Sequence, residues 1–589
     1  MSPASEFIYA TEITSVNRKN AVSIVILTII ASTAVSLIVA GQTQAPPPLK
    51  ESTFDVIIRN GHILDGSGNP WYGADIGIKG DRIAAIGTLD GARATKVIDA
   101  TDRIVSPGFI DMLGQSEYPL LIDNRSISKL AQGITSEITG EGASIAPHNQ
   151  KTLAPLKPFL DHYKLTVDWT TLDEYFKRLE KQGTPINIGT YVGAAQVREA
   201  VIGDDDRAPT PAELEQMKQL VAQAMKDGAL GISTALIYPP GHYAKTDELI
   251  ELAKVAAHYG GIYGTHMRSE GASEMEAIDE AIRIGREAGI PVEIFHMKVS
   301  GKPRWGSMTK VVEKIQAARD RGLDIRANQY PYVAGGTALA SALPPWVADG
   351  GTEKLLARLR DPKIRGRIKD EMAADHPDWE NLYFDCGGGS GVMIAGVINP
   401  DLKKYSGKMV SELATAEHKP ELDALFDFIL ADQAQTGALY FMASEQDLLY
   451  GLKQRWTSIG LDASETGLDG PLYEPYDHPR AFGSMARFLG HYVRDQKQMP
   501  LEEAIRKITS MPAQRERLVD RGLIKTGFYA DVTVFDPDTI IDEATYQDPN
   551  KLAKGVDYVL VNGQVEFDHG GLTGVTAGRA LRGQGWAGH

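Results

Sequence analysis

Helices and short apolar strands alternate through the middle of the chain, and this alternation limits the possible folds more than any other feature. Thr210-Pro-Ala-Glu213 combines a capping box with proline at the first helical position, and apolar residues follow at helical spacing. Asp227-Gly228 ends this predicted helix, and the next residues, 229–233, are typical of a strand. Similar units continue to Tyr330. Their length implies a parallel sheet with right-handed crossovers, and their number favours an α/β fold of the (β/α)8 barrel type.

Strand patterns dominate the two ends of the region that follows residue 52. Phe54–Ile58 is an apolar β-like run before an Asn-Gly turn, and Ala530–Phe535 has the same character near the other end. We therefore predict a small β-sandwich formed from both ends of the chain, residues 52–105 and 516–580. The barrel is predicted to occupy residues 106–515.

The regular alternation weakens between about residues 350 and 430. A charged helix is predicted around residues 358–372, and a glycine-rich segment, Cys386-Gly-Gly-Gly-Ser390, follows it. We interpret this region as an insertion over the mouth of the barrel that forms a lid or a wall of the substrate site. Cys386 is the single cysteine, which excludes an internal disulfide framework and a paired-cysteine metal site.

Residues 1–48 have the pattern of a targeting segment. Arg18 and Lys19 precede an uncharged apolar stretch, residues 21–40, and a proline-rich linker follows. This order is typical of a secretory signal, so we expect export to the periplasm or cell envelope. The stretch is also long enough to span a bilayer, and an uncleaved membrane anchor is the alternative.

The overall charge limits the possible partners. The chain has 77 acidic and 61 basic residues, for a net charge of −16, and such a balance repels phosphate backbones. We therefore expect no nucleic-acid partner. Hydrophobic residues make up 43% and charged residues 23% of the chain, which excludes a wholly disordered or multi-span membrane protein.

Two histidines end successive predicted strands. His266 follows residues 262–265 and His296 follows residues 292–295. Because the carboxyl ends of barrel strands face the catalytic mouth, the two imidazoles are expected there together, where they are suitable zinc ligands. For either histidine alone, a hydrogen-bonded structural role is the alternative. Arg268 and Lys298 each follow a histidine by two positions and suit a carboxylate substrate, although loop charges are an alternative reading.

Asp462 closes another short apolar strand, Ser458–Leu461, ahead of a loop. A carboxylate at the barrel mouth beside a metal can hold and deprotonate the attacking water. The alternative is a turn or cap residue, a common role of aspartate.

Several stretches resemble the amidohydrolase superfamily, and within it the D-aminoacylase (N-acyl-D-amino-acid deacylase) branch. Besides the two histidines and Asp462, the resemblance rests on Val105–Asp111, Gly203–Arg207, Tyr238–Gly241, Gly264–Glu270, Gln329–Tyr332, Leu343–Trp346, His478–Arg480 and Gly527–Pro537. It extends from about Phe54 to about Arg579. The resemblance implies the same barrel and sandwich, and zinc-dependent hydrolysis of an N-acyl group from a D-amino acid.

The chain also departs from the family pattern. The family's His-x-His pair is replaced by Leu113-Gly114-Gln115, and its cysteine ligand aligns with Gly142. Alanines, Ala194 and Ala195, stand where relatives often have His-Gly. We therefore expect one zinc per chain, with His266, His296 and a carboxylate as ligands.

Glu141 is the candidate for the carboxylate ligand, because it stands beside the vacated cysteine position. A turn carboxylate is the alternative reading of Glu141. Gln115 and Glu117 are weaker ligand candidates, since glutamine is a poor zinc ligand.

These observations predict a zinc-dependent amidohydrolase that acts on N-acyl-D-amino acids or on small peptides containing D-residues. Asp462 is the predicted general base and acid. The residues predicted to bind the substrate carboxylate or acyl oxygen are Arg268, Lys298, Tyr330 and Tyr332. The alternative is a metal-poor relative that binds an acylated or peptidic ligand without hydrolysis.

Overall fold

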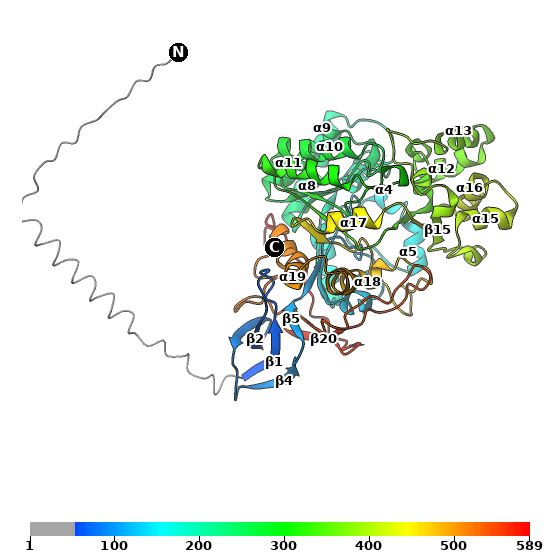
Figure 1. Ribbon diagram of the computed structural model, residues 1–589. Helices are drawn as coiled ribbons and strands as arrows, with labels where there is room; N and C mark the ends of the chain where they lie inside the picture. Colours follow the sequence, from blue (N-terminus) through cyan, green and yellow to red (C-terminus); the bar gives the residue numbers. More distant parts are fainter. Residues whose placement is uncertain (1–52, 589) are drawn as a thin grey trace, which may run out of the picture. The chain divides into compact units, whose positions relative to one another are not determined.

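The computed structural model describes residues 53–588 (Figure 1). Within this range, parallel strands form a closed barrel, with β8 and β9 acting as one interrupted strand. Met112 N lies 3.2 Å from Ile459 O, and Gly114 pairs with Ala463, so the last strand closes against the first. The predicted (β/α)8 barrel is therefore confirmed. Its strands are β6 (Phe109–Asp111), β7 (Ile134–Thr139), β8 (Asn187–Thr190), β9 (Val192–Gly193), β10 (Gly231–Ala235), β11 (Ile262–His266), β12 (Val292–Ile294), β13 (Ile325–Gln329) and β17 (Thr457–Ile459).

Amphipathic helices cover the outside of the barrel. Helix α8 (Pro211–Asp227) begins at the Thr210 capping box and ends at Gly228, whose φ of 110° is favourable only for glycine. Its inner face buries Met217, Val221 and Met225 against the strands. Helices α9 (Thr246–His258), α10 (Glu274–Ala288) and α11 (Met308–Asp320) follow the same plan. The capping and apolar spacing in the sequence thus produce the helices that hold the barrel strands in place.

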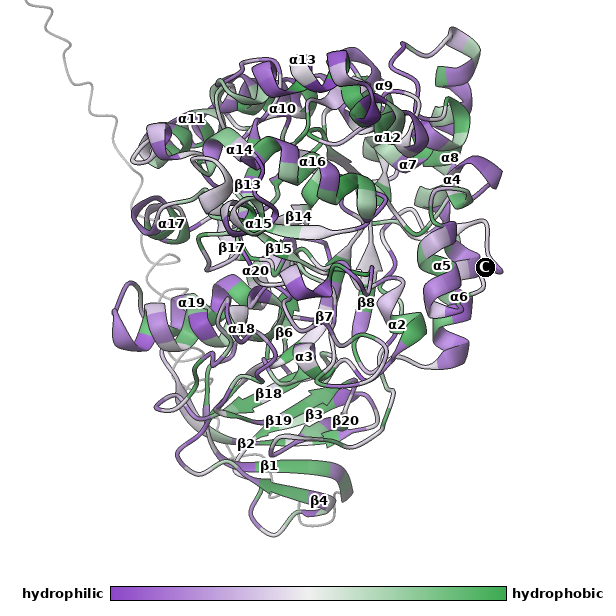
Figure 2. Ribbon diagram, turned by 90° about the vertical axis from the view of Figure 1, so that its right-hand side faces the viewer, coloured by the Kyte–Doolittle hydropathy of each residue, from purple (hydrophilic) through white to green (hydrophobic). Residues whose placement is uncertain are grey.

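The two ends of the described chain share one mixed sheet. Strand β5 (Ile104–Pro107) pairs antiparallel with β18 (Val532–Phe535), which joins the N-terminal strands to the C-terminal ones. The predicted β-sandwich from both ends is confirmed, and Figure 1 shows the blue strands beside the red β20. In Figure 2, much of β1, β18 and β19 has the green colour of hydrophobic residues. The other strands are β1 (Thr53–Ile63), β2 (Tyr72–Lys79), β3 (Arg82–Gly87), β4 (Arg93–Asp99), β19 (Val556–Val561), β20 (Gln564–Asp568) and β21 (Gly571–Leu572).

An insertion between β13 and β17 forms a subdomain with its own apolar core. A small antiparallel sheet, β14 (Gly335–Ala338), β16 (Gly437–Tyr440) and β15 (Val392–Ala395), packs with helices α12 (Thr352–Arg360), α13 (Pro362–Met372), α15 (Val410–Glu417) and α16 (Glu421–Ala431). The insertion is longer than the predicted 350–430. Its yellow-green helices gather at one side of the barrel in Figure 1.

The predicted signal or anchor, residues 1–48, lies outside the described residues. Among residues 53–588, no helix is both long enough and apolar enough to cross a membrane.

Candidate metal centre

Three side chains converge at the carboxyl ends of barrel strands. His266 is the last residue of β11, His296 lies two residues after β12, and Glu141 lies two residues after β7. All three side chains are at most 9% exposed. The φ of His296 is 33°, an unusual value for a residue with a side chain, and its N–H donates to Asn328 Oδ1 at 2.9 Å. Such backbone strain is concentrated at functional sites.

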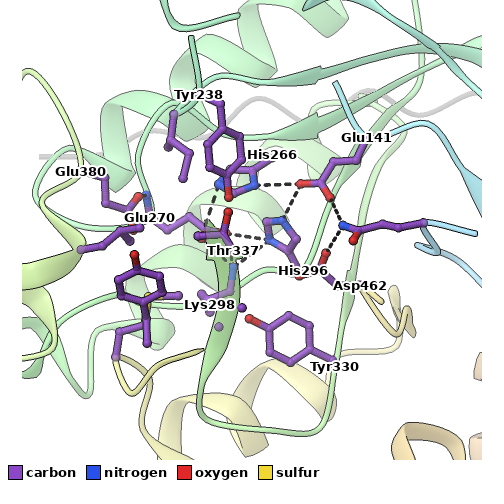
Figure 3. A pocket seen from close by; sticks show the side chains of 17 residues that line it. Glu141, Tyr238, His266, Glu270, His296, Lys298, Tyr330, Thr337, Glu380 and Asp462 are labelled. Atoms are coloured by element: carbon purple, nitrogen blue, oxygen red, sulfur yellow. Dashed lines mark hydrogen bonds and ion pairs between the residues drawn. The ribbon is translucent and has the colours of Figure 1, made fainter. Parts of the chain in front are cut away.

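One carboxylate oxygen lies between the two imidazoles. Glu141 Oε1 is 2.9 Å from His266 Nδ1 and 3.0 Å from His296 Nε2, as the dashed lines in Figure 3 show. The potential ligand atoms of the three residues lie within 4.8 Å of one another, and no other such group exists among residues 53–588. Two imidazole nitrogens and a carboxylate oxygen are a known catalytic zinc set. The donor set therefore fits zinc, as the sequence predicted for these three residues.

The charges of the group also suit a divalent cation. Burial opposes ionisation of Glu141, but the imidazoles of His296 and His266 hold its pKa well below the ordinary value. Burial and the neighbouring His296 lower the pKa of His266, so this imidazole keeps a free lone pair. Burial and Lys298 lower the pKa of His296, but nearby carboxylates outweigh them and raise it to about 9. The excess of negative charge around His296 is what a bound cation would balance.

Glu270 and Lys298 both contact His296 at its Nδ1 atom. His296 Nδ1 lies 3.0 Å from Glu270 Oε1, and Lys298 Nζ lies 2.7 and 2.6 Å from the two Glu270 oxygens. Burial opposes ionisation of Glu270, yet Lys298 and the histidines lower its pKa to about 2. Lys298 Nζ also lies 2.7 Å from His296 Nδ1, and contacts to this ring nitrogen orient the ring so that the other nitrogen faces the metal position. Glu270 was missed as a site residue in the sequence, although its position four residues after His266 was a signal.

Asp462 faces the same cavity from the closing strand. It lies three residues after β17, with a φ of 53°, and its Oδ2 lies 2.5 Å from Arg480 Nη1. Its Oδ1 accepts a hydrogen bond from Gln115 at 3.0 Å. Burial raises the pKa of Asp462 to about 6 against the opposing effect of Arg480. A carboxylate with such a pKa can accept and release a proton near neutral pH.

A cavity of about 200 Å3 joins these groups. Of the predicted substrate-binding residues, Lys298 and Tyr330 line it. The Tyr330 hydroxyl is buried without a hydrogen-bond partner within residues 53–588, and burial raises its pKa to about 12, so it is a donor. The insertion contributes a further wall, made of Gly335, Gly336, Thr337, Glu380, Leu382, Tyr440 and Met442.

Arg268 and Tyr332 do not line this cavity. The Arg268 guanidinium is held by Glu280 at 2.9 Å and by backbone carbonyls of the preceding loop. Tyr332 donates a hydrogen bond to Asp542 at 3.1 Å and borders a much smaller cavity, which shares the wall residues His296, Lys298 and Tyr330 with the first. Their positions after strand ends suggested the site, but each side chain is bound by a carboxylate on another segment and neither lines the cavity.

The departures from the family pattern have structural reasons. Leu113 is 1% exposed and packs in an apolar cluster with Tyr191 and Phe295, so it fills space in the barrel interior. Gly142 has a φ of 69°, and a Cβ there would lie 2.4 Å from that of Ala235. No side chain fits at 142, and Glu141 supplies the carboxylate instead.

Three of the remaining positions do not line the cavity. Ala194 and Ala195 open helix α7 (Ala194–Val201). Glu117, a weaker ligand candidate, is buried outside the cavity wall, and burial raises its pKa to about 7.

Several known proteins are similar to this chain. The profile of the amidohydrolase family matches residues 466–567. D-aminoacylase of Alcaligenes xylosoxydans xylosoxydans is 36% identical over 530 residues, which cover 90% of this chain and 97% of that protein. A solved D-aminoacylase with a binuclear metal centre, described as showing one-metal activation and second-metal attenuation, has a TM-score of 0.74 and 33% identity. The match covers 90% of this chain and all of that chain.

A second solved structure is similar over the same share of the chain. N-acyl-D-glutamate deacylase of Bordetella bronchiseptica, complexed with zinc and a phosphonate inhibitor, has a TM-score of 0.75 and 30% identity, with 90% of this chain and all of that chain covered. Together with the barrel, the β-sandwich and the metal-ligand group, these similarities place the protein among hydrolases that act on C–N bonds. The chain belongs to the D-aminoacylase branch of the amidohydrolase superfamily.

Proposed function

We propose that this protein is a zinc-dependent hydrolase that cleaves the amide bond of N-acyl-D-amino acids. The observation that carries the proposal is the convergence of His266, His296 and Glu141 beside Asp462 in one cavity. The similarity to D-aminoacylase over 90% of this chain supports the substrate class. Small peptides with D-residues present the same amide bond and are a second substrate class.

Different residues of the chain have different roles in the proposed reaction. His266, His296 and Glu141 would hold the metal. When bound there, zinc polarises the scissile carbonyl and lowers the pKa of a bound water. Asp462 accepts the proton of the attacking water and passes it to the leaving amine, for which its pKa of about 6 is suitable. Arg480 keeps this carboxylate oriented.

Lys298 and Tyr330 are the proposed substrate contacts. The ammonium group of Lys298 and the hydroxyl of Tyr330 both line the cavity, and the Tyr330 hydroxyl has a free donor. A cation and a neutral donor suit a carboxylate or an acyl oxygen.

Metal replacement combined with a substrate panel tests the proposal. The purified protein is stripped with a chelator, reloaded with zinc, and assayed on matched N-acetyl-D- and N-acetyl-L-amino acids. We expect turnover of D-substrates that returns with zinc. A protein that binds these compounds but never hydrolyses them, with or without zinc, would favour the metal-poor binding protein instead.

A further inference from the structure

A single amide group lies between the proposed third ligand and the proposed base. Gln115 Nε2 is 3.2 Å from Glu141 Oε2 and 3.0 Å from Asp462 Oδ1. Both partners are carboxylates, which only accept hydrogen bonds, so the amide nitrogen must face them. Each of its two hydrogens therefore has one acceptor.

The backbone around Gln115 is held on both sides. Gly114 N donates to Ile138 O of β7 at 2.7 Å, and Ser464 Oγ donates to Gln115 O at 2.9 Å. Asp462 N in turn donates to Leu113 O at 2.6 Å. The extension of β6 thus runs between β7, which precedes Glu141, and the segment that carries Asp462.

The two oxygens of Glu141 consequently have separate partners. Oε1 faces His266 and His296, and Oε2 faces the Gln115 amide. Without the amide, two buried carboxylates would face each other, and like charges at short range repel strongly in a buried site. A neutral donor removes this repulsion without adding a metal ligand.

We propose that Gln115 is a positioning residue whose amide takes the place of a second cation, orienting Glu141 toward one zinc and Asp462 toward the substrate. This inference rests on the proposed function. It explains how the site keeps its geometry after Leu113 and Gly142 have replaced usual ligands. It also predicts that the chain binds one zinc rather than two.

Three variants test the role of Gln115. Gln115→Met preserves most of the side-chain volume but removes both donors, and Gln115→Glu replaces them with a third carboxylate. Gln223→Met is the matched control, because Gln223 donates to the Asp227 carboxylate at 2.7 Å on helix α8, outside the cavity. Thermal unfolding of all three proteins reports whether they fold.

The first readout is zinc affinity, measured by competition with a chromophoric chelator. Residues that orient metal ligands are typically worth about 10–100-fold in affinity. We expect a loss of about 10-fold or more in Gln115→Met and none in Gln223→Met, with wild-type stoichiometry near one zinc per chain. Equal affinity in these two variants, or two tightly held ions in the wild type, would overturn the proposal.

The second readout is the pH profile of kcat. Losing a donor to Asp462 disfavours its ionised form, so the acid limb should move to higher pH in Gln115→Met and further in Gln115→Glu, with KM nearly unchanged. An acid limb at the wild-type position in both variants would contradict the role. If the wild-type protein hydrolyses no N-acyl amino acid, the proposed function fails. The zinc titration still tests whether Gln115 positions the metal ligand Glu141.

Discussion

Arg480 and Asp462 form a buried ion pair in which Nη1 lies 2.5 Å from Oδ2. The guanidinium also lies over the ring of Tyr330, 4.7 Å from its centroid. One arginine therefore connects the proposed base with a proposed substrate contact. This pair connects the loop after β17 to helix α18 (Arg480–Arg487) and holds one of the two oxygens of Asp462.

Arg480 should control the pH at which the enzyme becomes active. Turnover requires ionised Asp462, so kcat should fall as the pH drops through about 6. Arg480→Met removes the largest of the positive charges that oppose the effect of burial, which raises the pKa of Asp462 and moves the acid limb to higher pH. Arg480→Lys keeps a cation, so its acid limb should lie between those of the wild type and Arg480→Met. A pH series of kcat measures this, and superimposable profiles for all three proteins would contradict it.

Asp462→Asn should separate proton transfer from metal binding. The side chain keeps its size but no longer accepts a proton, and general acid–base assistance is typically worth about 10²–10⁴-fold. We expect kcat to fall by at least about 10²-fold, while elemental analysis finds the zinc retained by the other residues. Full turnover in this variant would show that another group is the base.

His266→Ala and His296→Ala should lose metal and activity together, because each removes one of the two imidazole ligands. His258→Ala is the control, since His258 is an exposed residue at the end of α9. Zinc content and turnover are measured on the same preparations. A His266→Ala protein that keeps its zinc would mean that the ligand set is wrong.

Glu141→Gln and Glu270→Gln should both weaken zinc binding, for different reasons. Glu141 is a proposed ligand, so its loss should be the larger effect. Glu270 orients His296 without being a proposed ligand, and its replacement should cost about 10–100-fold in affinity. Glu280→Gln, which alters the partner of Arg268 outside the cavity, should leave zinc affinity unchanged. Unaltered affinity in Glu141→Gln would instead support a turn role for that residue.

The N-terminal pattern predicts export or membrane anchoring through residues 21–40. Fractionation of native cells, with mass determination of the N-terminus, distinguishes a cleaved signal from a retained anchor. An intact chain found wholly in the cytosol would refute both.

Local patterns in the sequence determined most of the fold. The capping box at Thr210, the glycine at 228 and the spacing of apolar residues predict helices and strands because these signals act within a few residues. The same patterns place His266 and His296 at strand ends, and barrel geometry brings such ends together. Glu141 was predicted as the third ligand because it precedes Gly142, which aligns with the family's cysteine ligand.

Only the tertiary structure decided which polar side chains face the cavity. Arg268 follows its histidine as Lys298 does, yet Glu280 holds the arginine away while Glu270 holds the lysine at the wall. The sequence did not reveal that the Gln115 amide would lie between two carboxylates far along the chain. Strand and helix signals are local, whereas the direction of a long polar side chain depends on partners that folding brings from distant segments.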